Sequence, residues 1–321
     1  MTQLMAMPEH EVTTEPLAIE VRGLTMSYGS RQVLRGVDFE VRPGEVFCLL
    51  GPNGAGKTTT VEILEGFRQR TGGDVRVLGV DPADQRARLR ERIGIVLQEC
   101  GFPRQARVAE LIDIWRSYYP SPRATDDLLH VVELHEDKNT QVRKLSGGQR
   151  RRLDLALALA GDPDLIFLDE PTTGFDPESR RRCWGAIENL RALGKTVLLT
   201  THYLDEAERL ADRVAILRDG QIQVAGTVRH VARQAGVPTR ISFTAPQRLR
   251  DGDLTVPAGL NVKVTGEQAV CLSACTASAG AALRELLTWC AENDLGDLDD
   301  LSVVTPTLED AYLHLVAGGA R

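Results

Sequence analysis

The stretch GPNGAGKTT at residues 51–59 decides the fold of this 321-residue chain. It matches the pattern GxxxxGK[ST], follows the apolar run 45–50 and opens a segment, 57–67, that predicts a helix. In that context the amides of a glycine-rich turn cradle phosphate oxygens, while the lysine and threonine reach the outer phosphates and Mg²⁺. An ordinary strand-to-helix turn would explain the glycines but not the lysine-threonine pair. The residues expected to hold a nucleotide are Asn53, Gly54, Ala55, Gly56, Lys57, Thr58 and Thr59.

Two carboxylates follow a second apolar strand signal, in the run DLIFLDE at residues 164–170. Where a strand ends the backbone turns, so both side chains can approach the same nucleotide. We expect Asp169 to hold Mg²⁺, directly or through water. We expect Glu170 to orient and polarise the attacking water. A strand-end aspartate that caps a turn is common, but that alternative does not account for the second acid.

A second anion site is predicted at the run LSGGQ, residues 145–149. Its serine and glutamine fit a capping box, and residues 150–160 predict a helix. The two glycines would occupy the first helical turn, where each costs about 1 kcal/mol against alanine. Bare amides at a helix N-terminus suit an oxygen anion, although a glycine-tolerant helix start is the plainer alternative. The residues concerned are Ser146, Gly147, Gly148 and Gln149.

Further polar residues stand where predicted elements begin or end. Asp176, followed by proline, predicts a helix N-cap. Gln98 follows the predicted strand 93–97, and His202 follows the strand signal at 196–199. A histidine at a strand end in such a sheet lies on the ligand side. Tyr28 precedes Gly29, and an aromatic residue at such a position is more often part of the core than of a binding site.

Composition and charge limit the classes of function. Apolar residues make up 42% and charged residues 26%, which is typical of a globular protein. The net charge of −7 disfavours nucleic acid and polybasic membrane anchoring. The six cysteines are scattered, which favours reduced thiols. We expect no signal peptide, and no apolar run approaches the ~20 residues that a membrane-spanning helix needs.

The order of predicted elements indicates an α/β protein with three parts. Residues 1–16 are expected to form a flexible leader. Strand and helix signals alternate over 17–234, which predicts a helix-covered, largely parallel sheet with a helical insertion at about 100–150. Beyond a Gly/Pro-containing break, residues 239–321 predict a small α/β domain.

Taken together, these residues resemble the ATPase subunits of ATP-binding-cassette (ABC) transporters over about residues 17–230. The runs at 51–59, 164–170 and 145–149 correspond to the Walker A, Walker B and signature motifs. The resemblance implies a P-loop NTPase fold with a RecA-like core, an antiparallel β-subdomain and a helical insertion. It also implies roles for Gln98 as the catalytic and metal-binding Q-loop glutamine, for Asp176 in the D-loop, for His202 as the switch histidine and for Tyr28 in stacking on adenine.

The resemblance implies ATP and Mg²⁺ as cofactors and a mechanism that needs partners. Two copies would pack head to tail, and each ATP would lie between one copy's Walker A and the other's signature. The helical insertion would move a separate membrane permease, which would hold the chain at the cytoplasmic face of the cell membrane. We expect that contact near Phe102, Leu111, Trp115 and Tyr118, whose helical spacing suits the insertion's own core equally well.

Within this family the chain resembles the daunorubicin-resistance group. The runs EPTTGFDP at 170–177 and PTLEDAYL at 306–313 carry that resemblance, with Phe175 standing where leucine is usual. Such ATPases serve exporters of drugs, antibiotics, polysaccharides or other hydrophobic and glycolipid cargo, and they carry a small C-terminal domain. Multidrug efflux and antibiotic resistance are therefore among the expected functions.

Two alternatives belong to other classes of function. A soluble cassette protein acting on ribosomes or DNA usually carries two cassettes or long coiled-coil insertions, and this chain has one cassette and a short insertion. Its acidic balance also argues against nucleic acid. A regulatory cassette that binds ATP without turnover is opposed by the presence of Lys57, Glu170 and His202.

Overall fold

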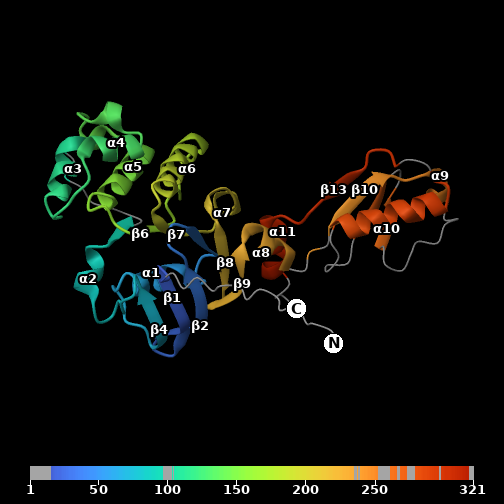
Figure 1. Ribbon diagram of the computed structural model, residues 1–321, viewed down its shortest axis with the longest axis horizontal. Coiled ribbons are helices and arrows are strands. Elements are labelled where there is room, and N and C mark those ends of the chain that lie inside the picture. Colours follow the sequence, from blue (N-terminus) through green and yellow to red (C-terminus); the bar gives the residue numbers. More distant parts are fainter. Residues whose placement is uncertain are drawn as a thin grey trace, which may run out of the picture.

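The fold is built on a mixed sheet whose order within the described residues is β5-β6-β7-β3-β8-β9, with only β9 antiparallel to its neighbour (Figure 1). The computed structural model describes residues 16–96, 103, 105–234, 237, 239–251, 261–265, 268–272, 279–295 and 298–317. The strands of this sheet are β3 (Val46–Leu50), β5 (Ile93–Val96), β6 (Leu165–Asp169), β7 (Thr196–Thr201), β8 (Arg213–Arg218) and β9 (Gln221–Thr227).

Strand β3 shows why this sheet is covered on both faces. All five of its residues are buried. Successive side chains point to opposite faces, so Cys48 and Leu50 enter one apolar cluster while Phe47 and Leu49 enter another. Parallel strands buried on both faces are typical of α/β proteins. The continuous apolar runs in the sequence therefore become the central strands of the molecule.

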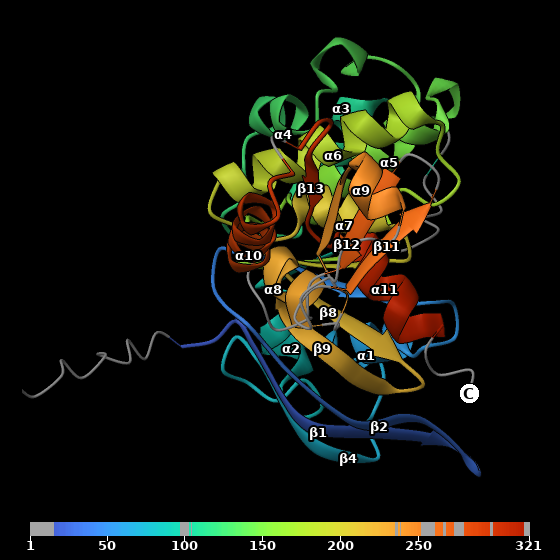
Figure 2. The same cartoon turned by 90° about the vertical axis from the view of Figure 1, so that its right-hand side faces the viewer.

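A second, antiparallel sheet of order β2-β1-β4 packs against one side of the first, and Figure 2 shows it along the lower edge. Phe39 of this sheet stacks on Phe47 of the central sheet with ring centroids 5.4 Å apart. The second sheet is the antiparallel β-subdomain that the resemblance implies. Its strands are β1 (Ile19–Tyr28), β2 (Arg31–Val41) and β4 (Gly72–Val77).

Helices pack against the central sheet. In Figure 1 the helices of the insertion, α3 and α4, gather with α5 at one end of the molecule. Leu111 of α3 is completely buried and Trp115 packs against the same cluster, whereas Tyr118 is 73% exposed. Leu111 is therefore a core residue of the insertion, and Phe102 lies outside the described residues. The helices are α1 (Lys57–Leu64), α2 (Arg86–Arg90), α3 (Val108–Arg116), α4 (Thr125–Val131), α5 (Gly147–Ala158), α6 (Pro177–Ala192), α7 (Leu204–Leu210) and α8 (Val228–Gln234), with 3-10 turns at His135–Asp137 and Val142–Lys144.

Beyond α8 the chain forms a lobe with its own small core, seen on the right of Figure 1. Its sheet has the order β11-β12-β10-β13. Ile241 and Phe243 of β10 pack against Leu286 and Trp289 of α10. The elements of this lobe are β10 (Arg240–Thr244), α9 (Gln247–Arg250), β11 (Asn261–Thr265), β12 (Gln268–Leu272), α10 (Ala279–Glu292) and β13 (Ser302–Val304).

The last helix, α11 (Leu308–Ala317), leaves the lobe and packs against α8 and α7 of the main body. Leu308 and Ala311 are buried there, and the Leu308 amide donates a hydrogen bond to Glu208. The predicted division into a leader, residues 17–234 and residues 239–321 stays a prediction, and residues 1–15 lie outside the described part. In the described part of the chain, no helix is both long enough and apolar enough to cross a membrane.

Candidate nucleotide-binding site

The phosphate loop joins the buried strand β3 to helix α1. Gly56 is the residue before the helix and has φ of 110°, a conformation that L side chains rarely adopt. A Cβ at this position would also lie 2.6 Å from Cδ2 of Leu34. Glycine is therefore required at the point where the loop turns into α1, which begins with Lys57 and Thr58.

Lys57 is 5% exposed and is held by the loop from which it projects. Its Nζ donates to the carbonyl oxygens of Gly51, at 2.8 Å, and Pro52, at 3.3 Å. The same ammonium forms an ion pair with Glu170, Nζ to Oε1 at 3.2 Å. The fold thus brings the expected phosphate-binding lysine and the second strand-end carboxylate into direct contact.

Asp169, at the end of β6, lies between the phosphate loop and β7. Its Oδ2 accepts a hydrogen bond from the Thr58 hydroxyl at 3.2 Å, and its Oδ1 accepts one from the Thr200 hydroxyl. Thr200 also fixes the next residue, because the Glu170 amide donates to its carbonyl and hydroxyl oxygens, each at 3.1 Å. Thr200 therefore positions both carboxylates.

Glu170 lies among positive and polar groups in an unusual backbone conformation. Its φ is 46°, in the left-handed region that non-glycine residues rarely adopt. The Nδ1 atom of His202 lies 3.3 Å from its Oε1. Partial burial alone would raise the pKa of Glu170, but the Lys57 ammonium and the neighbouring His202 outweigh it and lower that pKa below its usual range. Glu170 is therefore a carboxylate at neutral pH.

A hollow of about 370 Å³ lies beside the loop, and Lys57, Thr58 and Glu170 border it. Tyr28 stands at its edge, 43% exposed, with its hydroxyl 3.5 Å from the Thr59 hydroxyl. The Arg68 guanidinium lies 5.0 Å from the Tyr28 ring centroid. Tyr28 is thus a wall of the hollow and not a core residue. The other lining residues are Arg31, Val33, Asn53, Gly54, Gly56, Lys57, Thr58, Thr59 and Glu170.

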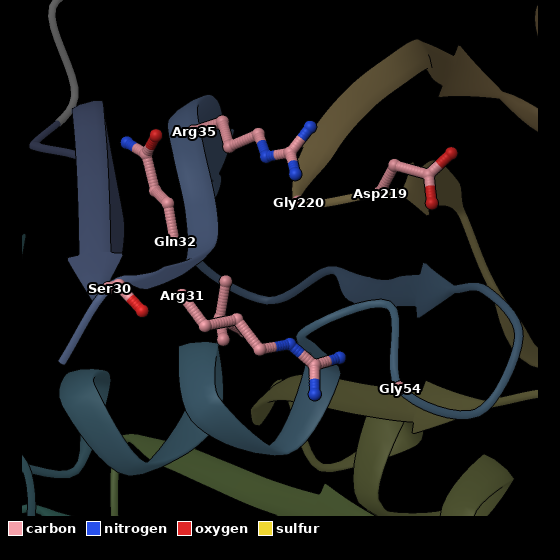
Figure 3. A pocket seen from close by; sticks show the side chains of 8 residues that line it. Ser30, Arg31, Gln32, Arg35, Gly54, Asp219 and Gly220 are labelled. Carbon is pink, nitrogen blue, oxygen red and sulfur yellow. The ribbon is translucent and has the colours of Figure 1, made fainter. Parts of the chain in front are cut away.

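A neighbouring hollow borders the same loop, and Figure 3 shows the residues that line it. This hollow has a volume of about 440 Å³ and shares Arg31, Val33 and Gly54 with the first. In Figure 3 the Arg31 side chain extends toward the loop that carries Gly54, and Arg35 extends toward Gly220. Positive charge therefore borders the loop on the side of the β1–β2 hairpin.

The LSGGQ segment forms a separate hollow of about 300 Å³ at the start of α5. The predicted capping box is confirmed: the Gln149 amide donates to the Ser146 hydroxyl at 3.2 Å, and the Gln149 side chain accepts from the Ser146 amide at 2.9 Å. Asp176 caps α6 as predicted, because its Oδ1 accepts from the amides of Glu178 and Ser179. The hollow is lined in part by Ser146, Gly148, Gln149, Asp176 and Ser179.

Most of the predicted site residues lie either at the phosphate loop or at the signature hollow. The signature hollow and the hollow beside the phosphate loop share no lining residue. Ala55 is a buried residue of the loop, Gly147 borders neither hollow, and Gln98 lies outside the described residues. The sequence reasoning missed Thr200, Arg31 and Val33. Of these, only Thr200 could have been found, since it directly follows the strand signal at 196–199 that also precedes His202.

The residues present suit a phosphate-bound magnesium ion. Mg²⁺ prefers oxygen ligands and in phosphate sites usually takes one or two from the protein. The Thr58 hydroxyl and the Asp169 carboxylate, in mutual contact beside the loop, supply that donor set. The described residues contain no group of three or more His, Cys, Asp or Glu able to hold a metal by themselves.

A glycine-rich loop at the carboxyl end of a parallel strand, with a hydroxyl and two carboxylates beside it, defines a P-loop nucleotide-binding protein. Residues 34–173 match the profile of the ABC transporter family. The Nod factor export ATP-binding protein I of Rhizobium johnstonii is 37% identical over 94% of this chain and 95% of its own length. The protein of that name from Paraburkholderia xenovorans is 38% identical over 79% of this chain and 85% of its own.

Solved structures agree in fold. An ATP-binding subunit of an ABC transporter has a TM-score of 0.60 and 28% identity, covering 68% of this chain and 93% of that one. The cbiO1 protein from Clostridium perfringens, part of an ABC transporter complex, has a TM-score of 0.62 and 26% identity over 68% and 91%. This chain belongs to the ABC transporter family. It is an ATP-binding and ATP-hydrolysing transporter subunit, and its fold is the ABC cassette that the sequence predicts.

Proposed function

We propose that the chain binds Mg-ATP at residues 51–59 and works as half of a head-to-tail dimer. The observation that carries this proposal is the separation of the two hollows, which share no residue. A helix N-terminus with two glycines suits a phosphate, yet the phosphate loop of the same copy does not border it. In the proposed dimer the signature hollow of one copy closes over the nucleotide bound by the other.

The chemistry follows from the contacts in the hollow beside the loop. Lys57 is placed to meet the outer phosphates, and Glu170 is ionised and able to accept a hydrogen bond from the attacking water. Thr58 and Asp169 would hold Mg²⁺, which offsets negative charge on the phosphates when bound. His202 lies against Glu170 and would orient it toward the γ-phosphate. Tyr28 would stack on adenine from the edge of the hollow, and Gln98 would complete the metal site.

We propose further that ATP binding and hydrolysis drive export through a separate membrane permease, which would hold the chain at the cytoplasmic face of the membrane. On the insertion, Ile114 and Tyr118 are 48% and 73% exposed and offer apolar surface for that contact. The relatives are named for Nod factor export. A drug, an antibiotic or a glycolipid is the cargo class that we propose here, with the choice made by the permease.

The first test replaces the proposed catalytic carboxylate. Glu170→Gln removes the charge that accepts a proton or hydrogen bond from water, so we expect kcat for ATP hydrolysis to fall at least about 100-fold. ATP affinity is retained, and a dimer accumulates with ATP. Asp164→Asn at the other end of β6 is the matched control, because Asp164 is exposed and pairs only with Arg92 among the described ion pairs. Normal turnover in Glu170→Gln contradicts the proposal.

A mixing experiment tests whether each ATP site is shared between two copies. Lys57→Ala damages the phosphate loop, and Ser146→Arg puts bulk and charge into the signature hollow, so each variant alone is expected to be nearly inactive. A mixed dimer holds one intact composite site, formed by Lys57 of one copy and Ser146 of the other. Equimolar mixing should therefore restore a substantial part of the wild-type rate. No recovery on mixing contradicts shared sites.

The permease is tested by affinity purification of the full chain from detergent-solubilised membranes. We expect a polytopic membrane protein to be recovered in stoichiometric amount, and a Tyr118→Asp variant to recover less of it. The exposed but distant Leu313→Asp is the control. Recovery of ribosomes alone would favour the soluble cassette alternative.

A further inference from the structure

The loop that carries Glu170 is held in a conformation that it would not adopt by itself. A non-glycine residue with φ near 46° is strained, and such residues persist where surrounding contacts determine them. On one side the contact is Thr200, which binds the Glu170 amide. The carbonyl groups of the residues before and after Glu170 are held from a different element.

Arg151 of α5 binds the carbonyl groups of the two residues that flank Glu170, Asp169 and Pro171. Its Nη2 donates to the carbonyl oxygen of Asp169 and its Nε to that of Pro171, each at 3.1 Å. Arg151 is 7% exposed, so these bonds are shielded from water. A guanidinium presents several donors in a fixed plane, which lets one side chain set the spacing of two acceptors.

The same helix begins at the signature hollow. Ser146 caps α5 and Gly148 borders the hollow, and Arg151 stands one turn further along. The next residue, Arg152, donates to the carbonyl oxygens of Val132 and Glu133 in the helical insertion. Helix α5 is thus hydrogen-bonded to the insertion by one arginine and to the loop of Glu170 by its neighbour.

We propose that Arg151 is a positioning residue that couples the signature helix of a copy to the catalytic glutamate of that same copy. The inference rests on the proposed function. When α5 engages the nucleotide of the partner subunit, a shift of the helix is passed through the guanidinium to the carbonyls on both sides of Glu170. The two composite sites of the dimer are then linked through Arg151 in each copy.

A merely structural role is the competing explanation, because Arg151 also lies 3.8 Å from the mostly buried carboxylate of Asp154. Arg151→Lys separates the two. The lysine keeps the positive charge near Asp154, but a single ammonium does not reproduce the fixed two-point grip on the carbonyls. We expect kcat for ATP to fall about tenfold or more, with the Kd for ATP within about twofold of wild type. Arg151→Gln offers only the N–H donors of a shorter, uncharged side chain. We expect it to lower kcat as well, with the Kd for ATP again close to wild type.

Epistasis with Glu170 provides the decisive readout. If Arg151 acts by placing the Glu170 carboxylate, adding Arg151→Lys to Glu170→Gln should lower the residual single-turnover rate by less than twofold. Arg213→Lys is the matched control for stability, since Arg213 also donates to a carbonyl oxygen and a carboxylate but lies on β8, bonded to Glu40 and Glu45. Its loss in unfolding temperature should resemble that of Arg151→Lys, with kcat near wild type.

Each outcome decides a different claim. An equal fractional loss of rate in the wild-type and Glu170→Gln backgrounds, or a kcat within twofold of wild type in both Arg151 variants, overturns the positioning role and leaves the proposed function standing. A loss of ATP binding in Arg151→Lys identifies a folding defect and overturns it as well. Turnover that is unaffected by Glu170→Gln overturns the proposed function first and the positioning role with it.

Discussion

At the scale of the residue, Asp154 shows how burial sets a charge state. Its carboxyl group lies on the inner side of α5, mostly buried, and Oδ1 is buried without a hydrogen-bond partner among the described residues. Burial raises the pKa of Asp154 to about 7, although Arg151 and Arg150 act in the opposite direction. At pH 6 this side chain is therefore largely protonated in the folded protein and ionised in the unfolded chain.

The sign of the stability effect follows from that difference. Between pH ~4 and the folded pKa, the folded protein keeps a proton that the unfolded chain releases, so the free energy of unfolding falls as pH rises. The slope from one such group is about 1.4 kcal/mol per pH unit in that window. Asp154→Asn removes this term. We expect the difference in unfolding free energy between variant and wild type, measured by urea denaturation at pH 5 to 8, to move in favour of the variant as pH rises. A difference that stays constant with pH contradicts the shifted pKa.

The site could be predicted from sequence where its signals are local. The phosphate loop with Lys57 and the strand end with Asp169 and Glu170 each match a motif in the sequence. The structure brings the side chains of the two motifs within hydrogen-bond distance. Arg151 could not be read in this way. Its partners are backbone carbonyl oxygens on another element, which leave no trace in residue types. The exposure of Tyr28 likewise depends on the arrangement of the small sheet and not on its neighbours in sequence.

At the scale of the element, the close packing of α5 on α6 depends on Gly148. A Cβ at this position would lie 2.9 Å from Cβ and Oγ of Ser179, whereas a Cβ at Gly147 would meet nothing within 4 Å. The Ser179 hydroxyl is itself held by Asp176 at 2.6 Å, so it is not free to turn aside. Helix packing thus requires glycine at position 148 but not at position 147.

This contrast gives a matched pair of substitutions. Gly148→Ala should lower the free energy of unfolding by about 1–3 kcal/mol, because the two helices must move apart. Gly147→Ala should leave it unchanged or raise it by up to about 1 kcal/mol, because alanine favours the helix. Thermal unfolding of the full chain measures both. Equal shifts in the two variants contradict the packing argument.

Element boundaries were less predictable than element types. Alternating apolar residues at 17–21 and 37–41 mark only the outer ends of β1 and β2, which extend to Tyr28 and begin at Arg31. The parts of β1 and β2 next to the hairpin turn face solvent on one side and carry polar residues and glycines. They therefore lack the continuous apolar run that marks the strands of the central sheet. The order of the sheets follows from pairing between distant segments, such as that of β1 with β4.

At the scale of the whole molecule, the last helix ties the end of the chain to the main body. Leu308 is 1% exposed and belongs to the same apolar cluster as Ala207 and Leu210 of α7, the helix that follows His202. Arg218 of β8 also donates to the carbonyl oxygen of Leu315. The position of α7 therefore depends in part on residues about a hundred positions further along the chain.

Substitutions on the two faces of α11 test this dependence. Leu308→Ala leaves a cavity in the shared cluster and should lower the free energy of unfolding by about 2–5 kcal/mol. Leu313→Ala on the exposed face of the same helix should change it by less than about 0.5 kcal/mol. Denaturant unfolding of the full chain gives both values. A loss confined to the lobe, with the main body unfolding as in wild type, would contradict the packing of α11 on α7.

The contact between α8 and α11 has a consequence for engineering. The chain departs toward the lobe after α8 and comes back into α11, so the two crossing points are neighbours in space. Insertion of a foreign domain is tolerated best where its two ends meet the host close together. The segment between α8 and α11 is therefore suited to domain exchange. The lobe could be replaced there by a fluorescent or ligand-sensing module, while the ATP-hydrolysing main body and α11 stay intact.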